Sequence, residues 1–183
     1  MKWLTSAALA MFILIAATPA AAILTPVKAE VAVTYSLAGK SIGTSNWLND
    51  AKKQHELREI KTNIHKLKSL IGDVPYIPTG STPSGWDCSG LVMWFYQQLG
   101  MELVHSATAQ KNSGYFVSKP KLGDIVSFAH SKGDYAYHVG IYIGNGKMIH
   151  AGGKRGDSAS IVEVSDWAKW NGDSEVAYTR IVD

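Results

Sequence analysis

The stretch Trp86-Asp87-Cys88-Ser89-Gly90-Leu91-Val92 opens an apolar run with helical spacing. Asp87 is a favourable N-cap, because its carboxylate can accept hydrogen bonds from the free N–H groups of a first helical turn. Gly100 stands where a glycine commonly ends a helix. The pattern therefore predicts a helix over 87–99 that begins at a cysteine.

Cys88 is the only cysteine of the 183-residue chain. The free N–H groups and the dipole at a helix N-terminus favour a thiolate, so this position is expected to lower the pKa of the thiol. The chain also begins like a secreted protein, and secreted proteins use cysteines mostly in disulfide pairs. An unpaired cysteine then suggests a reactive thiol or an intermolecular bridge. The alternative is a buried structural cysteine.

The residues after Cys88 predict a helix-then-sheet order. A short helix is expected within 106–113, followed by short runs rich in Val, Ile and Tyr that are typical of strands. The predicted strands are 125–129, 138–143, 147–151, 161–164 and 176–182. Helices followed by an antiparallel sheet indicate an α+β fold.

The residues before Cys88 predict one long helix over 47–71. Leu57, Ile60, Ile64, Leu67 and Ile71 form a helical stripe, while lysines and arginine occupy the flanks. The stripe packing on the domain is the simplest interpretation. A short coiled coil and a contact with an anionic wall polymer are the alternatives. Residues 72–85 are rich in Gly, Pro, Ser and Thr, which indicates a loop.

The N-terminus resembles an export signal. Lys2 supplies the positive end, an apolar uncharged segment follows, and A-x-A-like sites end at Ala22 and Ala29. An uncleaved membrane anchor over 3–24 is the alternative. The predicted organisation is a signal peptide (1–29, cleaved after Ala22 or Ala29), a linker or pro-segment (30–46), the helix (47–71) and a catalytic domain (72–183). The net charge of +3 does not indicate nucleic-acid binding, which would need a concentrated basic patch.

A thiolate mechanism needs a base, and the best candidates are His138 and His150, because each lies at one end of a predicted strand. A two-residue type I′ turn at Asn145-Gly146 would place the two rings on opposite sides of the sheet. A three-residue Gly144–Gly146 loop with a bulge pairs Ile143 with Lys147, Ile141 with Ile149 and Val139 with Ala151. That register sorts apolar from polar side chains better. It puts both imidazoles on one face, beside Gly140.

The cysteine motif and the two histidine strands, in their order along the chain, resemble the NlpC/P60 family of papain-like cysteine peptidases, which cut bacterial peptidoglycan. The similarity extends over about 74–182. It comprises an aromatic-then-glycine segment (76–80), the nucleophile motif (86–92), a Gly-Asp strand entry (122–128), the base strand (138–144) and His150-Ala151. Thr79 replaces a common second glycine, and Val104 replaces a common proline before His105.

The resemblance implies a papain-like fold in which the nucleophile helix packs on a small antiparallel sheet. It implies Cys88 as nucleophile, His138 as base and His150 as the residue that orients His138. Tyr76 would assist the Cys88 N–H in binding the oxyanion. Asp87 and Ser89 would recognise the free amine of the stem peptide, although an N-cap explains Asp87 equally well.

The expected substrate is the peptidoglycan stem peptide, cut between D-glutamate and the diamino acid by a secreted or wall-associated enzyme. No metal or other cofactor is expected, because one cysteine and no HExxH motif provide no usual zinc ligand set. Neither nucleic acid nor membrane beyond the signal segment is an expected partner, and a monomer is expected. The alternatives are a CHAP-type N-acetylmuramoyl-L-alanine amidase and a non-catalytic cell-wall-binding module.

Overall fold

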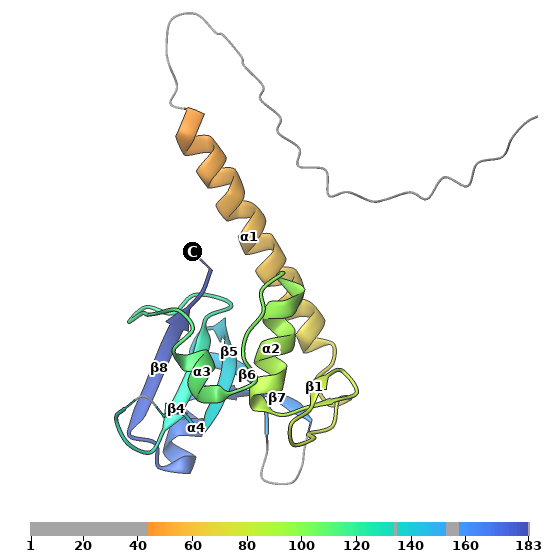
Figure 1. Ribbon diagram of the computed structural model, residues 1–183, viewed down its shortest axis with the longest axis vertical. Helices are drawn as coiled ribbons and strands as arrows, with labels where there is room; N and C mark the ends of the chain where they lie inside the picture. Colours follow the sequence, from red (N-terminus) through yellow and green to blue (C-terminus); the bar gives the residue numbers. More distant parts are fainter. Residues whose placement is uncertain (1–43, 134, 153–157, 183) are drawn as a thin grey trace, which may run out of the picture. The chain divides into compact units, whose positions relative to one another are not determined.

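The computed structural model of the protein describes residues 44–133, 135–152 and 158–182 (Figure 1). The predicted signal peptide and residues 30–43 of the predicted linker lie outside these ranges. Residues 44–46, also assigned to the linker, instead form the first turn of a helix.

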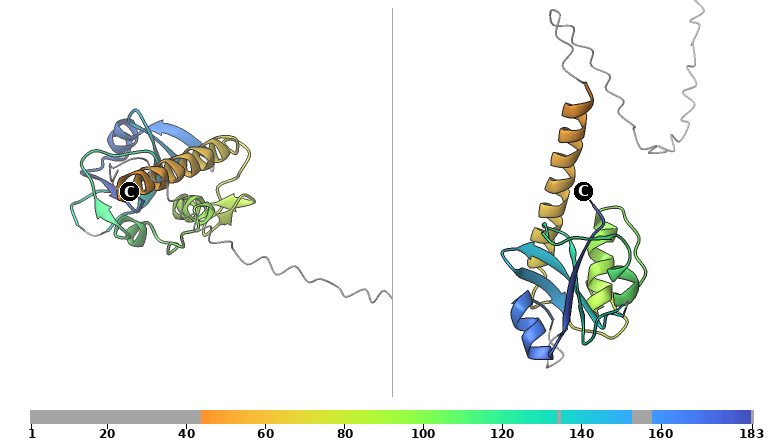
Figure 2. Two further views of the ribbon diagram at one scale, coloured as in Figure 1. Left: turned by 90° about the horizontal axis from the view of Figure 1, so that it is seen from above. Right: turned by 90° about the vertical axis from the view of Figure 1, so that its left-hand side faces the viewer.

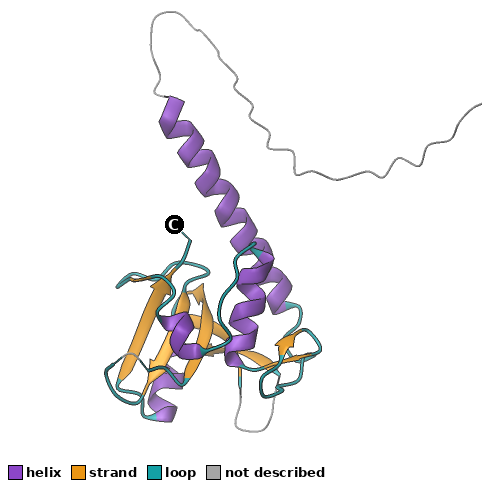
Figure 3. Cartoon of the chain, viewed as in Figure 1, coloured by secondary structure: helices purple, strands orange, loops and turns teal. Residues whose placement is uncertain are grey.

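The centre of the fold is an antiparallel six-stranded sheet (Figure 3). Its strands, in their order across the sheet, are β3 (Tyr115–Phe116), β8 (Glu175–Arg180), β4 (Ile125–Ala129), β5 (His138–Gly144), β6 (Lys147–Ala151) and β7 (Ala159–Glu163). Strands β1 (Ser81–Thr82) and β2 (Gly85–Trp86) form a separate ribbon ahead of the nucleophile helix. The α+β prediction is confirmed.

Two helices cover opposite faces of the sheet (Figure 2). Helix α2 (Cys88–Gln98) packs on one face, where Val139, Ile141 and Ile149 are fully buried. Helix α4 (Val164–Asn171) packs on the other face, against Phe128 and other side chains. Because strand side chains alternate, His138 and His150 lie on the α4 side.

Helix α1 (Thr44–Lys68) begins and ends three residues earlier than predicted. The regular helix stops at Lys68 because the next N–H groups, of Leu70 and Ile71, donate to carbonyls three residues back. Ile60, Ile64 and Leu67 are buried in the core, so the apolar stripe packs on the domain. Residues 46–55 are exposed. None of the helices in the described ranges is long and apolar enough to cross a membrane.

The β5–β6 hairpin combines features of both registers considered from the sequence. Gly144 pairs with Lys147, and Asn145 and Gly146 have positive φ angles of 53° and 73°, as in a two-residue type I′ turn. The register then shifts between Tyr142 and Gly144. The predicted pairing of Ile143 with Lys147 is therefore wrong, because the extra residue lies within the strand and not in the turn.

The shift restores the predicted register at Ile141. Ile141 pairs with Ile149, as predicted, and both imidazoles consequently lie on one face. A Cβ built on Gly140 would lie 3.2 Å from the His150 Cβ, so a glycine here leaves room for the ring.

Four elements were not predicted: α4, the short edge strand β3, and the two-residue strands β1 and β2, which form where a loop was expected. Helix α4 begins after Glu163 without a side-chain capping hydrogen bond, so its start carries no sequence signal. Its end does carry one, because Gly172 adopts the left-handed conformation that stops a helix. The short helix α3 (Ala107–Lys111) lies inside the predicted 106–113 segment, with Ser106 as its N-cap.

Candidate active site

Cys88 is the first residue of α2, and hydrogen bonds to Asp87 hold this end of the helix in place. The Asp87 Oδ1 accepts from the Gly90 N–H at 2.7 Å and from the Ser89 hydroxyl at 3.0 Å. The N-cap prediction is confirmed. A Cβ at Gly90 would overlap the carbonyl oxygen of Gly80, so α2 and the preceding loop can approach this closely only at a glycine.

The 77–80 turn adds a further contact to the same carboxylate. The Gly80 N–H donates to the Ile77 carbonyl, and Thr79 has a φ of 63°, the conformation that a type II turn requires at this position. This conformation explains why glycine suits the position better than threonine. The Thr79 N–H donates to Asp87 Oδ2 at 3.0 Å.

Burial raises the pKa of the Cys88 thiol, and the nearby Asp87 charge raises it further. The backbone N–H groups of Val139, Ser89 and Cys88 act in the opposite direction but do not outweigh burial. The expectation of a lowered thiol pKa at the helix N-terminus is therefore wrong. The half-buried thiol is neutral until a base removes its proton.

His138 and His150 form a buried pair. The His138 Nε2 lies 3.0 Å from the His150 Nδ1, and the side chains are 5% and 1% exposed. Burial lowers the pKa of both rings, to about 4 for His150, and the neighbouring His150 lowers that of His138 further. Both rings are therefore neutral near pH 7, as a general base must be.

Cys88 and the imidazoles approach one another at the start of β5. The Val139 N–H, one residue after His138, lies beside the Cys88 thiol. A Cβ built on Gly152 would lie 3.4 Å from the His138 Cε1 and 3.5 Å from the Tyr76 Cε2. The Tyr76 and His138 rings thus flank Gly152.

Tyr76 belongs to the nucleophile side of the site through its parallel bridge to Trp86. Burial raises the pKa of its hydroxyl, and so do the Asp87 carboxylate and the Cys88 thiol whenever that thiol is deprotonated. The hydroxyl is thus a neutral hydrogen-bond donor near the thiol. Its part in oxyanion binding stays a prediction.

The predicted substrate-binding pair, Asp87 and Ser89, is engaged within the protein. His105 adds a third contact to the Asp87 Oδ1, at 2.8 Å. Burial raises the pKa of the Asp87 carboxyl, but the His105, Gly90 and Ser89 hydrogen bonds outweigh it and keep the pKa below its ordinary value. Ser89 is buried and donates to Asp87. Their role toward substrate stays a prediction.

Two residues that the sequence did not single out contact the histidine pair. The Ser160 hydroxyl lies 3.1 Å from the His150 Nε2. The Trp167 ring stacks on His138, with centroids 4.5 Å apart, and packs edge-on against His150 at 4.3 Å. Ser160 is the direct cross-strand partner of His150, so a predicted β6–β7 register would have found it. Trp167 belongs to α4, the helix that was not predicted.

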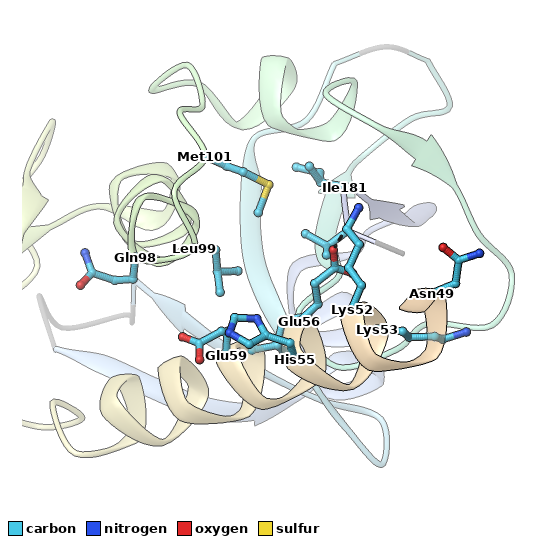
Figure 4. A pocket seen from close by; sticks show the side chains of 12 residues that line it. Asn49, Lys52, Lys53, His55, Glu56, Glu59, Gln98, Leu99, Met101 and Ile181 are labelled. Carbon is cyan, nitrogen blue, oxygen red and sulfur yellow. Dashed lines mark ion pairs between the residues drawn. The ribbon is translucent and has the colours of Figure 1, made fainter. Parts of the chain in front are cut away.

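A groove lies away from these residues, between α1 and the ends of α2 and β8 (Figure 4). It encloses about 990 Å³. Lys52, Lys53, Glu56, Leu99 and Ile181 are among its lining residues, and none of the predicted site residues belongs to it. Within the described part of the chain, no group of three or more His, Cys, Asp or Glu side chains is arranged to hold a metal ion.

The model of the NlpC/P60 family matches residues 72–172, which is more than half of the chain and includes every predicted site residue. The chain belongs to the NlpC/P60 family. This NlpC/P60 domain contains both the nucleophile helix and the histidine pair.

Two curated relatives are similar over much of the chain. A gamma-D-glutamyl-L-lysine dipeptidyl-peptidase of Bacillus cereus is 32% identical over 136 residues, which cover 69% of this chain and 40% of the relative. Murein DD-endopeptidase MepS/Murein LD-carboxypeptidase of Escherichia coli is 38% identical over 126 residues, which cover 63% of this chain and 65% of the relative. The match to mycobacterial probable endopeptidases spans only 20% of their length.

Solved structures of the family share the fold. The crystal structure of an NlpC/P60 family protein from Bacillus cereus superposes with a TM-score of 0.59 at 28% identity, and covers 68% of this chain and 40% of that one. The predicted papain-like NlpC/P60 fold is thereby confirmed.

Proposed function

We propose that the protein is a secreted cysteine peptidase that cleaves an amide bond in the stem peptide of bacterial peptidoglycan. One observation carries the proposal: a neutral, buried His138–His150 pair adjoins the helix N-terminus at which Cys88 lies. Membership of the NlpC/P60 family and the names of the curated relatives described above, which are peptidases or endopeptidases, support this substrate class.

The hydrogen-bond geometry supports a separate role for each ring nitrogen in the proposed mechanism. Because the His138 Nε2 faces His150, its Nδ1 is the nitrogen that takes the Cys88 thiol proton. The thiolate then attacks the amide carbonyl carbon. The oxyanion is bound by the Cys88 N–H, with the Tyr76 hydroxyl as a second donor.

Collapse of this tetrahedral adduct breaks the C–N bond. The proton held on His138 passes to the leaving amine, and a thioester remains on Cys88. His138 next takes a proton from water, and the resulting attack on the thioester releases the acid and restores the thiol. His150 keeps the His138 ring in orientation through both halves of the cycle.

The proposed scissile bond lies between D-glutamate and the diamino acid of the stem. The name of the Bacillus cereus relative supports this bond. The name of the Escherichia coli relative points instead to D,D or L,D bonds, which makes these bonds the second candidates. An N-acetylmuramoyl-L-alanine amidase and a non-catalytic wall-binding module complete the alternatives.

The test is to incubate the protein and its Cys88→Ala variant with purified peptidoglycan and to identify the released fragments by mass spectrometry. New amino termini on the diamino acid, absent with the variant, support the proposed bond. New L-alanine amino termini indicate an amidase, and new D-alanine amino termini or carboxyl ends indicate the second candidates. Binding without fragments, equal for both proteins, would contradict the peptidase proposal.

Secretion is tested separately. Expression with an epitope at the C-terminus, followed by N-terminal sequencing of the exported protein, should identify cleavage after Ala22 or Ala29. Retention of the intact N-terminus would favour the membrane-anchor alternative.

A further inference from the structure

We propose that Ser160 is a positioning residue, which extends the Cys88–His138–His150 arrangement by one hydrogen bond and selects the tautomer of His150 that keeps His138 available as a base. Ser160 lies on β7, directly opposite His150 on β6. Its hydroxyl is 3.1 Å from the His150 Nε2, while the other nitrogen of that ring is 3.0 Å from the His138 Nε2.

The position of each ring proton decides which nitrogen of His138 can act as a base. A neutral imidazole carries one N–H and one unprotonated nitrogen. For His138 to accept a proton at Nδ1, its own proton must lie on Nε2, so the Nε2–H donates to His150. The His150 Nδ1 must then be the unprotonated nitrogen, and its proton lies on Nε2, where the Ser160 hydroxyl accepts it.

The opposite tautomer of His150 would reverse the chain. An Nδ1–H on His150 would donate to the His138 Nε2 and force the His138 proton onto Nδ1, where it would block acceptance of the thiol proton. A serine hydroxyl can donate as well as accept. In our proposal Ser160 acts as the acceptor, so its loss leaves the His150 Nε2–H without this partner and weakens the preference for the productive tautomer.

The surroundings of His150 leave this role to Ser160. Trp167 contacts the ring through its aromatic surface and not through a hydrogen bond at Nε2. A small cavity of about 320 Å³ adjoins the same place and is lined by both His150 and Ser160. Ser160 thus borders open space, and Ser160→Thr keeps the hydroxyl, so this substitution is a conservative test.

The primary test reads the ring protons directly. In protein labelled with 15N-histidine, the nitrogen chemical shifts at pH 7 distinguish protonated from unprotonated ring nitrogens, with signals assigned in His138→Gln and His150→Gln variants. Wild type and Ser160→Thr should show His150 protonated at Nε2. Ser160→Ala should show a mixture of tautomers in both rings. Ser158→Ala is the matched control, because within the described residues the Ser158 hydroxyl donates to the neighbouring Ala159 carbonyl and does not contact either imidazole.

The kinetic consequence rests on the proposed function, whereas the ring states do not. On peptidoglycan fragments, Ser160→Ala should lower kcat about threefold to tenfold with little change in KM, because the lost bond contributes to orientation and not to substrate contact. Ser160→Thr should retain most of the activity, and thermal unfolding should confirm that each variant is folded.

The outcomes separate the two proposals. Wild-type ring states in Ser160→Ala would overturn the inference whatever the activity. Altered ring states with unchanged kcat would overturn the claim that the bond assists turnover. If wild-type protein cleaves no peptidoglycan, the proposed function fails, and the ring states still decide the role of Ser160.

Discussion

The two halves of the site are held together by different kinds of contact. On the nucleophile side, Cys88 is fixed by hydrogen bonds among residues close in the sequence, which converge on Asp87. On the base side, His138 and His150 are fixed by strand register, by a bulge and by stacking on Trp167, which lies 17 residues beyond His150 in the sequence. A helix cap forms from local sequence alone, whereas the imidazole pair exists only once the sheet and α4 have assembled.

The largest expected effect is a loss of kcat, and it should be equally large for substitutions on the Cys88 side and on the histidine side of the site. Cys88→Ala removes the nucleophile and His138→Ala the base, so each should lower kcat by about a thousandfold or more. Rates are measured on a defined stem-peptide substrate. The double variant should be scarcely slower than either single one, because the two groups act as a unit. Comparable turnover in either single variant would contradict the proposed roles.

Acid should lower the stability of the protein mainly through the buried histidine pair, and less through the contacts around Cys88. Burial lowers the pKa of His150 from an ordinary value of 6.5 to about 4, so the unfolded chain binds a proton more readily than the native protein between these pH values. Stability contributed by the neutral ring is complete above pH 6.5 and is lost as the pH falls toward 4. The loss from this one group approaches about 3 kcal/mol.

Urea unfolding at a series of pH values measures this loss. His150→Gln cannot take up the proton, so its free energy of unfolding should fall less steeply over the same range. His55→Gln, at an exposed position on α1, is the matched control and should follow wild type. Equal slopes for wild type and His150→Gln would show that the buried ring does not control the acid sensitivity.

On the Cys88 side of the site, stability should depend on the close approach of α2 to the Gly80 backbone. Gly90 lies inside α2, where alanine is ordinarily preferred over glycine by about 1 kcal/mol. Its Cβ would overlap the Gly80 carbonyl, so Gly90→Ala should instead destabilise the protein by about 2 kcal/mol. Chemical denaturation measures the change, with Gln97→Ala at an exposed position of the same helix as control. A stabilised Gly90→Ala would mean that the loop moves aside freely.

The same contrast explains how much of the site could be predicted from sequence. The α2 helix, its Asp87 cap and its solitary cysteine follow from local rules, and these predictions agree with the structure. The pairing of Ile141 with Ile149 was predicted because only that register sorts apolar from polar side chains. The extra residue that produces this pairing was predicted in the turn but lies within strand β5. Either position gives the same alternation of side chains beyond the extra residue, so the sequence pattern does not distinguish them.

Residues that depend on tertiary assembly were missed. Ser160 is an ordinary strand serine until β7 pairs with β6, and Trp167 is an ordinary apolar residue until α4 covers the sheet. The thiol pKa was misjudged for the same reason. The helix N-terminus can be recognised in the sequence, but the burial that outweighs it depends on the packing of α2 on β5.

The smallest expected effect separates two explanations of Asp87. Asparagine is also a good N-cap, so Asp87→Asn should keep the Gly90 contact at the helix start while removing the negative charge. If the carboxylate acts mainly within the protein, the variant should lose about 1 kcal/mol of stability, from the weakened His105 and Thr79 bonds, with KM little changed.

If Asp87 instead binds the free amine of the stem peptide, KM should rise severalfold for substrates with that amine and stay constant for N-acetylated ones. His105→Asn is the companion variant, because it releases the same carboxylate from one internal partner without removing its charge. A KM effect in Asp87→Asn but not in His105→Asn would assign the charge to substrate. Matching stability losses without a KM effect would assign Asp87 to the local network that holds Cys88 in place.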